Sequence, residues 1–166
     1  MTVAAFIVGV LGLVLGVLNF TWNIANYLLT GGRVKVQLQV GARGAGGAVI
    51  TGSQRMDDPQ LKKLAEQGFP EPVVIVSATN VGRQPVTVVK WSLRSGKVSF
   101  QPVGDAIGPS LPKRLDAGEQ ATWALPAIRA HGLMYATSET LGSRYRAHAE
   151  VFLADQRVIR SSEEIS

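Results

Sequence analysis

The chain has 166 residues, with 17 Lys and Arg against 12 Asp and Glu, and a formal charge of +5. This length allows one ordinary domain with one appended element. The absence of Cys excludes a disulfide framework, a thiolate zinc site, a cysteine nucleophile and a lipid attached through Cys. Residues 1–32 carry no charged side chain, so every charge lies from Arg33 onward.

An uninterrupted apolar run opens the chain and extends with mixed character to Leu29, before two glycines end it. A hydrocarbon core about 30 Å thick needs ~20 mostly apolar residues in a helix, and residues 3–22 supply them. The sequence therefore predicts a transmembrane anchor over residues 1–32. Trp22 and Tyr27 would lie where the helix emerges into the headgroup layer, which amphipathic rings prefer.

A cleaved secretory signal is the alternative to a retained anchor. Such a signal has a basic first segment, an apolar stretch of about 7–15 residues and a small-residue cleavage motif. Here no Lys or Arg precedes the apolar run, and the run is longer than that. Bulky Tyr27, Leu28 and Leu29 stand where an Ala-x-Ala motif would be expected. These features favour a retained anchor.

Basic residues flank only one end of the predicted helix. Arg33, Lys35 and Arg43 follow it, whereas only the α-amino group precedes it. Because cytoplasmic flanks carry the Lys and Arg excess, we expect a single-pass cell-membrane protein with its N-terminus outside and its folded domain in the cytoplasm. An exported domain would suit the absence of Cys equally well. The same basic residues predict attraction to anionic membrane lipid, worth about 1 kcal/mol per charge near the surface.

A stripe of small and amide residues runs along the predicted helix at alternating spacings of four and three, which keeps its members on one face. Small residues let helices approach closely in lipid, and amides can hydrogen-bond between helices for about 0.6–2 kcal/mol. The stripe predicts a helix–helix contact with itself or with another membrane protein, although Gly is also frequent in membrane helices generally. Its members are Ala5, Gly9, Gly12, Gly16, Asn19 and Asn23.

After the anchor, the hydrophobic period changes from helical to two. Residues 33–40 alternate between polar and apolar, which indicates a half-buried strand, and a glycine-rich turn leads to a return strand at residues 48–51. Asp58 and Pro59 then predict the start of a short helix, as N-cap and first helical residue, and Gly68 predicts its end.

Short apolar or alternating segments separated by turn residues continue through the domain. Seven or eight such strands, with turns every 8–12 residues, are typical of an antiparallel sandwich or barrel. Without a cysteine pair, Trp91 and Trp123 would have to fill the core between the sheets. A single helical turn is predicted at residues 126–130. The remaining predicted strands cover residues 72–79, 85–93, 97–100, 120–125, 134–137 and 145–153.

Strict alternation in one of these strands places Val88 and Trp91 on opposite faces of the sheet. We expect the β-domain to occupy residues 33–153. Residues 154–166 are mostly polar, and we expect them to form a C-terminal tail that frays.

Three turn and strand motifs punctuate the domain: Asn80-x-Gly82-Arg83-x-Pro85-Val86, then Leu111-Pro112-x-Arg114-Leu115-x-x-Gly118-Glu119 with Trp123, and Gly142-x-x-Tyr145-Arg146. Together they resemble small, uncharacterised proteins common in actinobacteria and their phages. The resemblance spans most of the chain and implies an immunoglobulin-like β-sandwich behind one membrane helix. The fold class is then mainly β: an N-terminal transmembrane α-helix and an antiparallel immunoglobulin-like β-sandwich with a short inserted helix.

No pattern in the sequence supplies catalytic chemistry. The glycines of residues 41–47 follow a strand, but a phosphate-binding loop must open a helix, and the next residues predict a strand, which favours a hairpin tip. His131 and His148 stand apart in the sequence, whereas a zinc site needs three or four ligands, so we expect both at the surface or at an edge. We therefore expect that the protein is not an enzyme and that it binds no cofactor, metal ion or small-molecule substrate.

The basic residues are too sparse and too mixed with acids to indicate nucleic-acid binding. The sequence predicts a non-enzymatic protein-interaction module held at the membrane, with lipid and a membrane protein, or a second copy, as partners. The alternative is a small accessory subunit of a larger membrane assembly, docked through the stripe. A hydrolase on a β-scaffold would need a nucleophile that no Gly-x-Ser-x-Gly motif provides.

Overall fold

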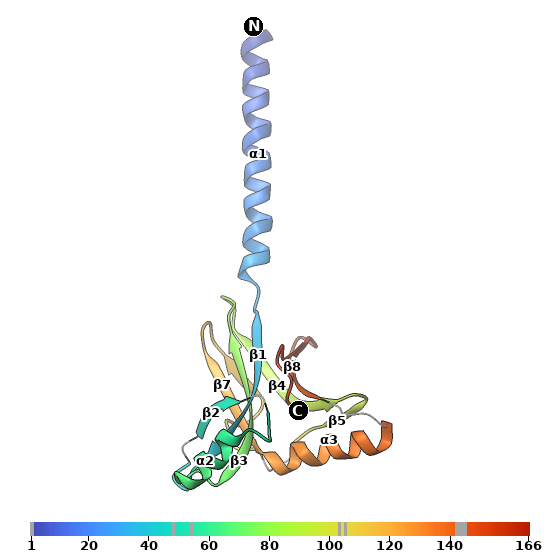
Figure 1. Cartoon of the computed structure of the whole chain (residues 1–166). Helices are drawn as coiled ribbons and strands as arrows, with labels where there is room; N and C mark the ends of the chain where they lie inside the picture. Colours follow the sequence, from blue (N-terminus) through green and yellow to red (C-terminus); the bar gives the residue numbers. More distant parts are fainter. Residues whose placement is uncertain (1, 48, 54, 103, 105, 142–145) are drawn as a thin grey trace.

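Helix α1 (Thr2–Thr30) stands apart from a domain built of two β-sheets (Figure 1). The computed structural model describes residues 2–47, 49–53, 55–102, 104, 106–141 and 146–166. Within α1, the span Ala5–Ile24 has a mean hydropathy of 2.1 and is 0% buried. Among the described residues, this is the one helix that is long and apolar enough to cross a membrane.

All strand pairs of the domain are antiparallel. The first sheet has the strand order β2-β1-β3-β7 and the second has β5-β4-β8-β9, with β6 also paired to β4. The predicted mainly β class, with two antiparallel sheets consistent with a β-sandwich, is confirmed. The strands are β1 (Val34–Arg43), β2 (Val49–Ser53), β3 (Glu71–Asn80), β4 (Val86–Ser95), β5 (Val98–Phe100), β6 (Lys113–Leu115), β7 (Gln120–Pro126), β8 (Ala147–Leu153) and β9 (Val158–Arg160).

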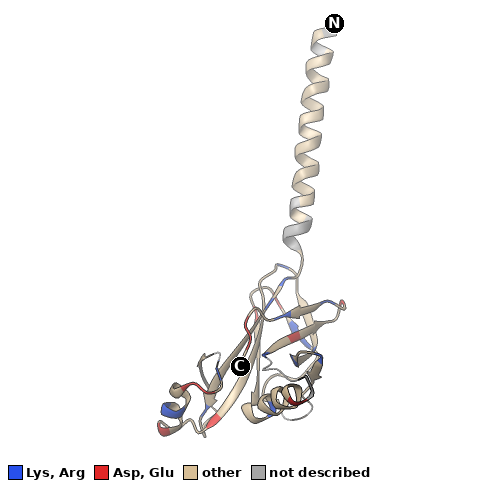
Figure 2. Ribbon diagram, turned by 45° about the vertical axis from the view of Figure 1, so that its right-hand side comes forward, with Lys and Arg blue, Asp and Glu red and all other residues tan. Residues whose placement is uncertain are grey.

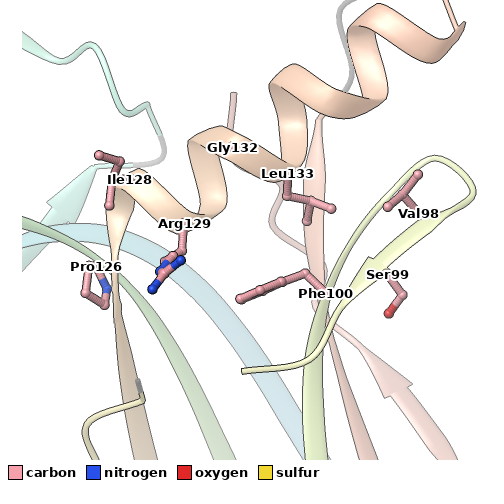
Figure 3. Close-up of a pocket in the computed structure, with 8 residues that line it drawn as sticks. All are labelled: Val98, Ser99, Phe100, Pro126, Ile128, Arg129, Gly132 and Leu133. Carbon is pink, nitrogen blue, oxygen red and sulfur yellow. The ribbon is translucent and has the colours of Figure 1, made fainter. Parts of the chain in front are cut away.

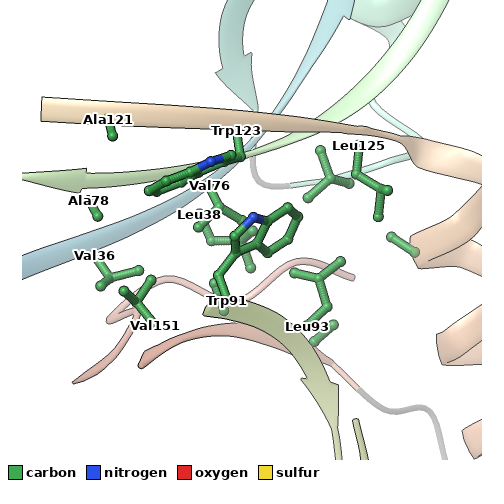
Figure 4. Packing of buried hydrophobic residues seen from close by; sticks show 14 of the residues in the cluster. Val36, Leu38, Val76, Ala78, Trp91, Leu93, Ala121, Trp123, Leu125 and Val151 are labelled. Atoms are coloured by element: carbon green, nitrogen blue, oxygen red, sulfur yellow. The ribbon is translucent and has the colours of Figure 1, made fainter. Parts of the chain in front are cut away.

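The core lies between the two sheets and is centred on a pair of tryptophans (Figure 4). Trp91 of β4 and Trp123 of β7 are each 2% exposed, and their ring centroids lie 6.5 Å apart at 34°. The aliphatic side chains of Leu38, Val76 and Leu93 surround them and are fully buried. The expectation that two indoles fill the space between the sheets is confirmed, and a tilted ring pair at this distance adds to the area that it buries.

A β-bulge in β4 overturns the predicted face assignment of that strand. The register with β8 shifts between Val88 and Lys90, and both Val88 and Trp91 are buried in the core. A bulge inserts one extra residue, so the side chains before and after it point to the same side of the sheet. The prediction that Val88 and Trp91 face opposite ways is therefore wrong, because alternation alone does not reveal a bulge.

Helix α2 (Pro59–Glu66) forms where the sequence predicts it, and its start is capped as expected. The Asp58 carboxylate accepts hydrogen bonds from the backbone N–H of Gln60 at 2.8 Å and from the Ser53 hydroxyl at 2.7 Å. These two donors, the Gln60 N–H first, hold the pKa of Asp58 below its usual value. Gly68 follows the helix with φ +97°, a conformation that Gly adopts without strain.

Helix α3 (Ala127–Leu141) replaces the single turn and the strand that the sequence predicts there. Ala127, Ala130, Leu133 and Thr137 are buried at spacings of three and four, which is the helical period. The Thr137 hydroxyl donates to the Leu133 carbonyl at 2.8 Å, so its burial leaves no polar atom unsatisfied. The strand predicted at residues 134–137 is wrong because a short apolar run does not distinguish strand from helix by itself.

The C-terminal residues belong to the domain and do not fray. Strand β9 pairs with β8, and Ile165 is fully buried beside it. Ile165 and Ala147 exchange two backbone hydrogen bonds of 2.9 and 3.0 Å. The expected polar tail at residues 154–166 is therefore wrong, because one apolar side chain near its end has a place in the core.

Gly132 tests the helical assignment of α3. It lies in the middle of the helix, is exposed, and a Cβ added there would meet no described atom within 4 Å. We expect Gly132→Ala to raise the free energy of unfolding by about 0.5–1 kcal/mol, since Ala favours the helix and loses less entropy on folding. Denaturant unfolding of the full chain in detergent measures this change. A loss of stability would contradict the helix.

Candidate interaction surfaces

The small-residue stripe lies along the bare surface of α1, which carries no charged residue (Figure 2). A Cβ added at Gly9, Gly12 or Gly16 would meet no described atom within 4 Å. The amides of Asn19 and Asn23 do lie on one face, since Nδ2 of Asn23 donates to Oδ1 of Asn19 at 3.2 Å. Ala5 lies on the same exposed helix. The stripe residues are therefore exposed along α1.

The predicted interfacial residues lie toward the domain end of α1. Trp22 is 67% exposed close to the end of the apolar span. Arg33 and Lys35 follow the helix and are exposed. Tyr27 belongs to α1, but its side chain lies outside the described residues.

A short linker joins α1 to the sheets and is held by the turn between β3 and β4. The carbonyl of Arg33 accepts from the N–H groups of Val81 at 2.8 Å and Gly82 at 3.2 Å. A Cβ at Gly82 would collide with Arg33 N and with the Gly31 carbonyl, so this close approach requires Gly. The backbone of the linker therefore packs directly against the backbone of the β3–β4 turn.

Arg157 braces the same linker from the turn between β8 and β9. Its Nη1 donates to the Gly32 carbonyl at 3.0 Å, and its Nη2 lies 2.6 Å from Oδ2 of Asp155. The hydrogen bonds from the guanidinium lower the pKa of Asp155, so the pair keeps its charges across the physiological range.

Asn80 explains why two of the sequence motifs occur together. It is fully buried, and its Nδ2 donates to the carbonyls of Gln84 at 2.8 Å and Leu115 at 3.1 Å. Its Oδ1 accepts from Gly82 N–H at 3.0 Å, and its backbone N–H donates to the Glu119 carbonyl at 2.9 Å. The two motifs therefore form one buried hydrogen-bond network beside the linker, centred on Asn80. Their residues stabilise the fold.

An apolar groove opens at the end of the domain that lies away from α1 (Figures 1 and 3). It lies between α3 and β5 and has a volume of about 770 Å³. Leu133 of α3 and Phe100 of β5 point into it, and Ile128 at its rim is 77% exposed. The other lining residues are Val98, Ser99, Pro126, Arg129 and Gly132. The sequence did not reveal this groove, because the prediction contained no α3 to form one wall.

A charged cluster on the outer face of the second sheet was also missed. Glu150 of β8 has a side chain only 4% exposed, and its Oε1 lies 3.0 Å from Arg160 Nε and 3.6 Å from Arg94 Nη1. His148 Nε2 lies 3.5 Å from the same oxygen. His148 lies two residues before Glu150 on β8, so strand alternation already predicts that the two share a face. The pairing register of β4, β8 and β9 adds Arg94 and Arg160, and a single sequence gives no signal of that register.

The described residues offer little that could do chemistry. They contain no group of three His, Asp or Glu side chains that could hold a metal ion. His131 is exposed on α3, far along the chain from His148. Ser92 lies opposite Glu150 across the strands but is 3% exposed, so a substrate could not reach its hydroxyl in this conformation.

In comparisons with known proteins, no protein-family model, curated protein or solved structure matches this chain.

A substitution at Asn80 tests the hydrogen-bond network beside the linker. We expect Asn80→Ala to lower the free energy of unfolding by about 2–4 kcal/mol, because it leaves the Leu115 carbonyl and its neighbours without a buried partner. Gln84→Ala is the matched control, since Gln84 takes part through its backbone carbonyl and its side chain is exposed. Denaturant unfolding should separate the two variants, and equal stabilities would contradict the role of Asn80.

Proposed function

We propose that this chain is a single-pass membrane protein whose β-sandwich acts, without catalysis, as a tethered protein-interaction module. The observation that carries the proposal is the exposure of α1. Its apolar span Ala5–Ile24 is 0% buried, so in water it would expose all of that surface. Hydrocarbon is the medium in which such a helix is stable, because its backbone groups are paired within the helix and its side chains are apolar.

The groove between α3 and β5 supports the interaction part of the proposal. It lies at the opposite end of the domain from α1, where a membrane would not cover it (Figure 1). Its wall combines Phe100 and Leu133 with the strongly exposed Ile128. An apolar segment of a partner protein that fills such a groove gains about 25 cal/mol for each Å² of apolar surface removed from water.

The mechanism that we propose is local concentration. A tether confines the domain to a thin layer at the membrane, which raises its effective concentration for a membrane partner without any new contact. We place the domain in the cytoplasm because Arg33, Lys35 and Arg43 follow the helix. We also infer that the sandwich has an immunoglobulin-like arrangement. The motifs around Asn80 and Leu115 and the paired tryptophans support this inference.

Crosslinking at the groove tests the interaction function. A photoreactive amino acid at position 128 of the full chain, expressed in its native membrane, should give a discrete adduct band. Val98→Asp should reduce that band at least about tenfold, because it places a carboxylate on the lining of the apolar groove at a side chain that is exposed. The same photoreactive group at Val89, which is exposed on β4 and does not line the groove, is the control. An equal adduct at position 89, or none at position 128, would contradict the groove.

An accessory subunit docked through α1 is the second candidate function. The observation that favours it is the open stripe, in which two paired amides extend a line of glycines with no described atom near them. Helices that approach through such a stripe gain close backbone contact and interhelical hydrogen bonds.

Substitution within the stripe tests this second function. We expect Gly12→Ile with Gly16→Ile to abolish self-association or partner association of the full chain in a membrane two-hybrid assay, because the added side chains hold the helices apart. Val10→Ile with Val14→Ile, on the opposite face of the helix, should leave the signal unchanged. No signal from any of these chains would leave α1 as a plain tether.

A further inference from the structure

The turn between β3 and β4, residues 81–85, lies at the level where α1 leaves a membrane. Only residues 31–33 separate α1 from β1, and the Arg33 carbonyl is bonded to the N–H groups of Val81 and Gly82. A chain extends at most about 3.6 Å per residue, so the turn lies within about 11 Å of the helix end. The turn is therefore fixed beside the helix exit and not carried away from it.

The length of α1 sets the depth of that exit. Its 29 residues span about 43 Å at 1.5 Å per residue. A bilayer with both headgroup layers is about 40–45 Å thick. If the helix fills that thickness, as its lack of any charged side chain permits, Thr30 reaches the headgroup surface and the turn lies directly against it.

The side chains of the turn suit that position. Val81 is 59% exposed although it is apolar, and Arg83 is exposed two residues later. An apolar side chain beside a basic one is the combination that the headgroup layer accommodates, with the apolar group toward the acyl chains and the cation at the phosphates. A guanidinium is well matched to phosphate because it donates parallel hydrogen bonds.

The acids at this end of the domain do not cancel its positive charge. Among the described residues at this end, three acids pair with basic side chains: Asp155 with Arg157, Glu119 with Lys113 at 2.8 Å, and Asp116 with Arg114 at 3.2 Å. Lys35 and Arg83 are exposed at the same end and add two further basic side chains. Lys35 and Arg83 therefore supply positive charge at the end of the domain next to α1.

We propose that the turn at residues 81–85 is a second membrane contact, in which Val81 enters the headgroup layer and Arg83 binds the phosphates of anionic phospholipids. This inference rests on the proposed insertion of α1. Because Asn80 and Gly82 hold the turn rigidly against the linker, the contact fixes the whole domain relative to the bilayer. The groove between α3 and β5 is then directed away from the lipid.

A single fluorophore on the full chain tests the contact, since the chain has no native Cys. Val81→Cys is labelled with an environment-sensitive dye and reconstituted in vesicles of phosphatidylcholine alone, or of phosphatidylcholine with one quarter phosphatidylglycerol. We expect a blue-shifted emission and at least about threefold weaker quenching by iodide than for a dye at Ile128→Cys. The shielding should be greater in the vesicles that contain phosphatidylglycerol.

Charge reversal identifies the part played by Arg83. In the Val81→Cys chain, Arg83→Glu should remove the extra shielding that phosphatidylglycerol gives. Arg83→Gln should remove most of it without adding a negative charge. Lys97→Glu makes the same charge change at the other end of the domain and should have no effect. Near-ultraviolet circular dichroism of the buried tryptophans checks that each variant is folded.

Flotation of the chain with vesicles after alkaline washing separates the possible failures. A chain that floats, but whose dye at position 81 is quenched as readily as that at position 128, would overturn the lipid contact and leave α1 as an anchor. Equal shielding in both kinds of vesicle, unchanged by Arg83→Glu, would overturn the anionic lipid as the ligand. A chain that fails to float would overturn both the contact and the proposed function.

Discussion

The constraint on which this molecule depends is an apolar helix that its own domain does not cover. The sandwich does not bury the span Ala5–Ile24 of α1, and its own core between the sheets is filled by Trp91, Trp123 and the aliphatic side chains around them. The helix must therefore find its apolar surroundings outside the chain. In the proposed insertion, a bilayer satisfies this requirement and also determines which end of the domain faces lipid.

The joint between helix and sheet transmits that constraint to the domain. A flexible linker would let the sandwich rotate freely beneath the membrane, but residues 31–33 are bonded to the β3–β4 turn and to Arg157. The Asn80 side chain bonds to the Leu115 carbonyl and so joins that turn to the end of β6. The strands then run from this joint toward α3, so the position of the groove follows from the position of the helix (Figure 1).

Features that depend on neighbouring residues could be predicted from the sequence, and features that depend on distant pairing could not. The apolar run predicted α1, and Asp58 with Pro59 predicted the start of α2, because the length of an apolar run and the capping of a helix are local properties. The bulge near Val88, the helical state of α3 and the burial of Ile165 each depend on what packs against them. The groove and the cluster around Glu150 were missed for the same reason, since strand register and a helix wall create them.

The most direct measurement is the mass and fractionation of the chain isolated from the cells that make it. We predict that the intact chain, with α1 still attached, stays in the membrane pellet after washing at alkaline pH. A chain that begins near residue 30 and is recovered in the aqueous fraction would show that the helix is a removed signal. Such a result would contradict the tethered domain and the lipid contact together.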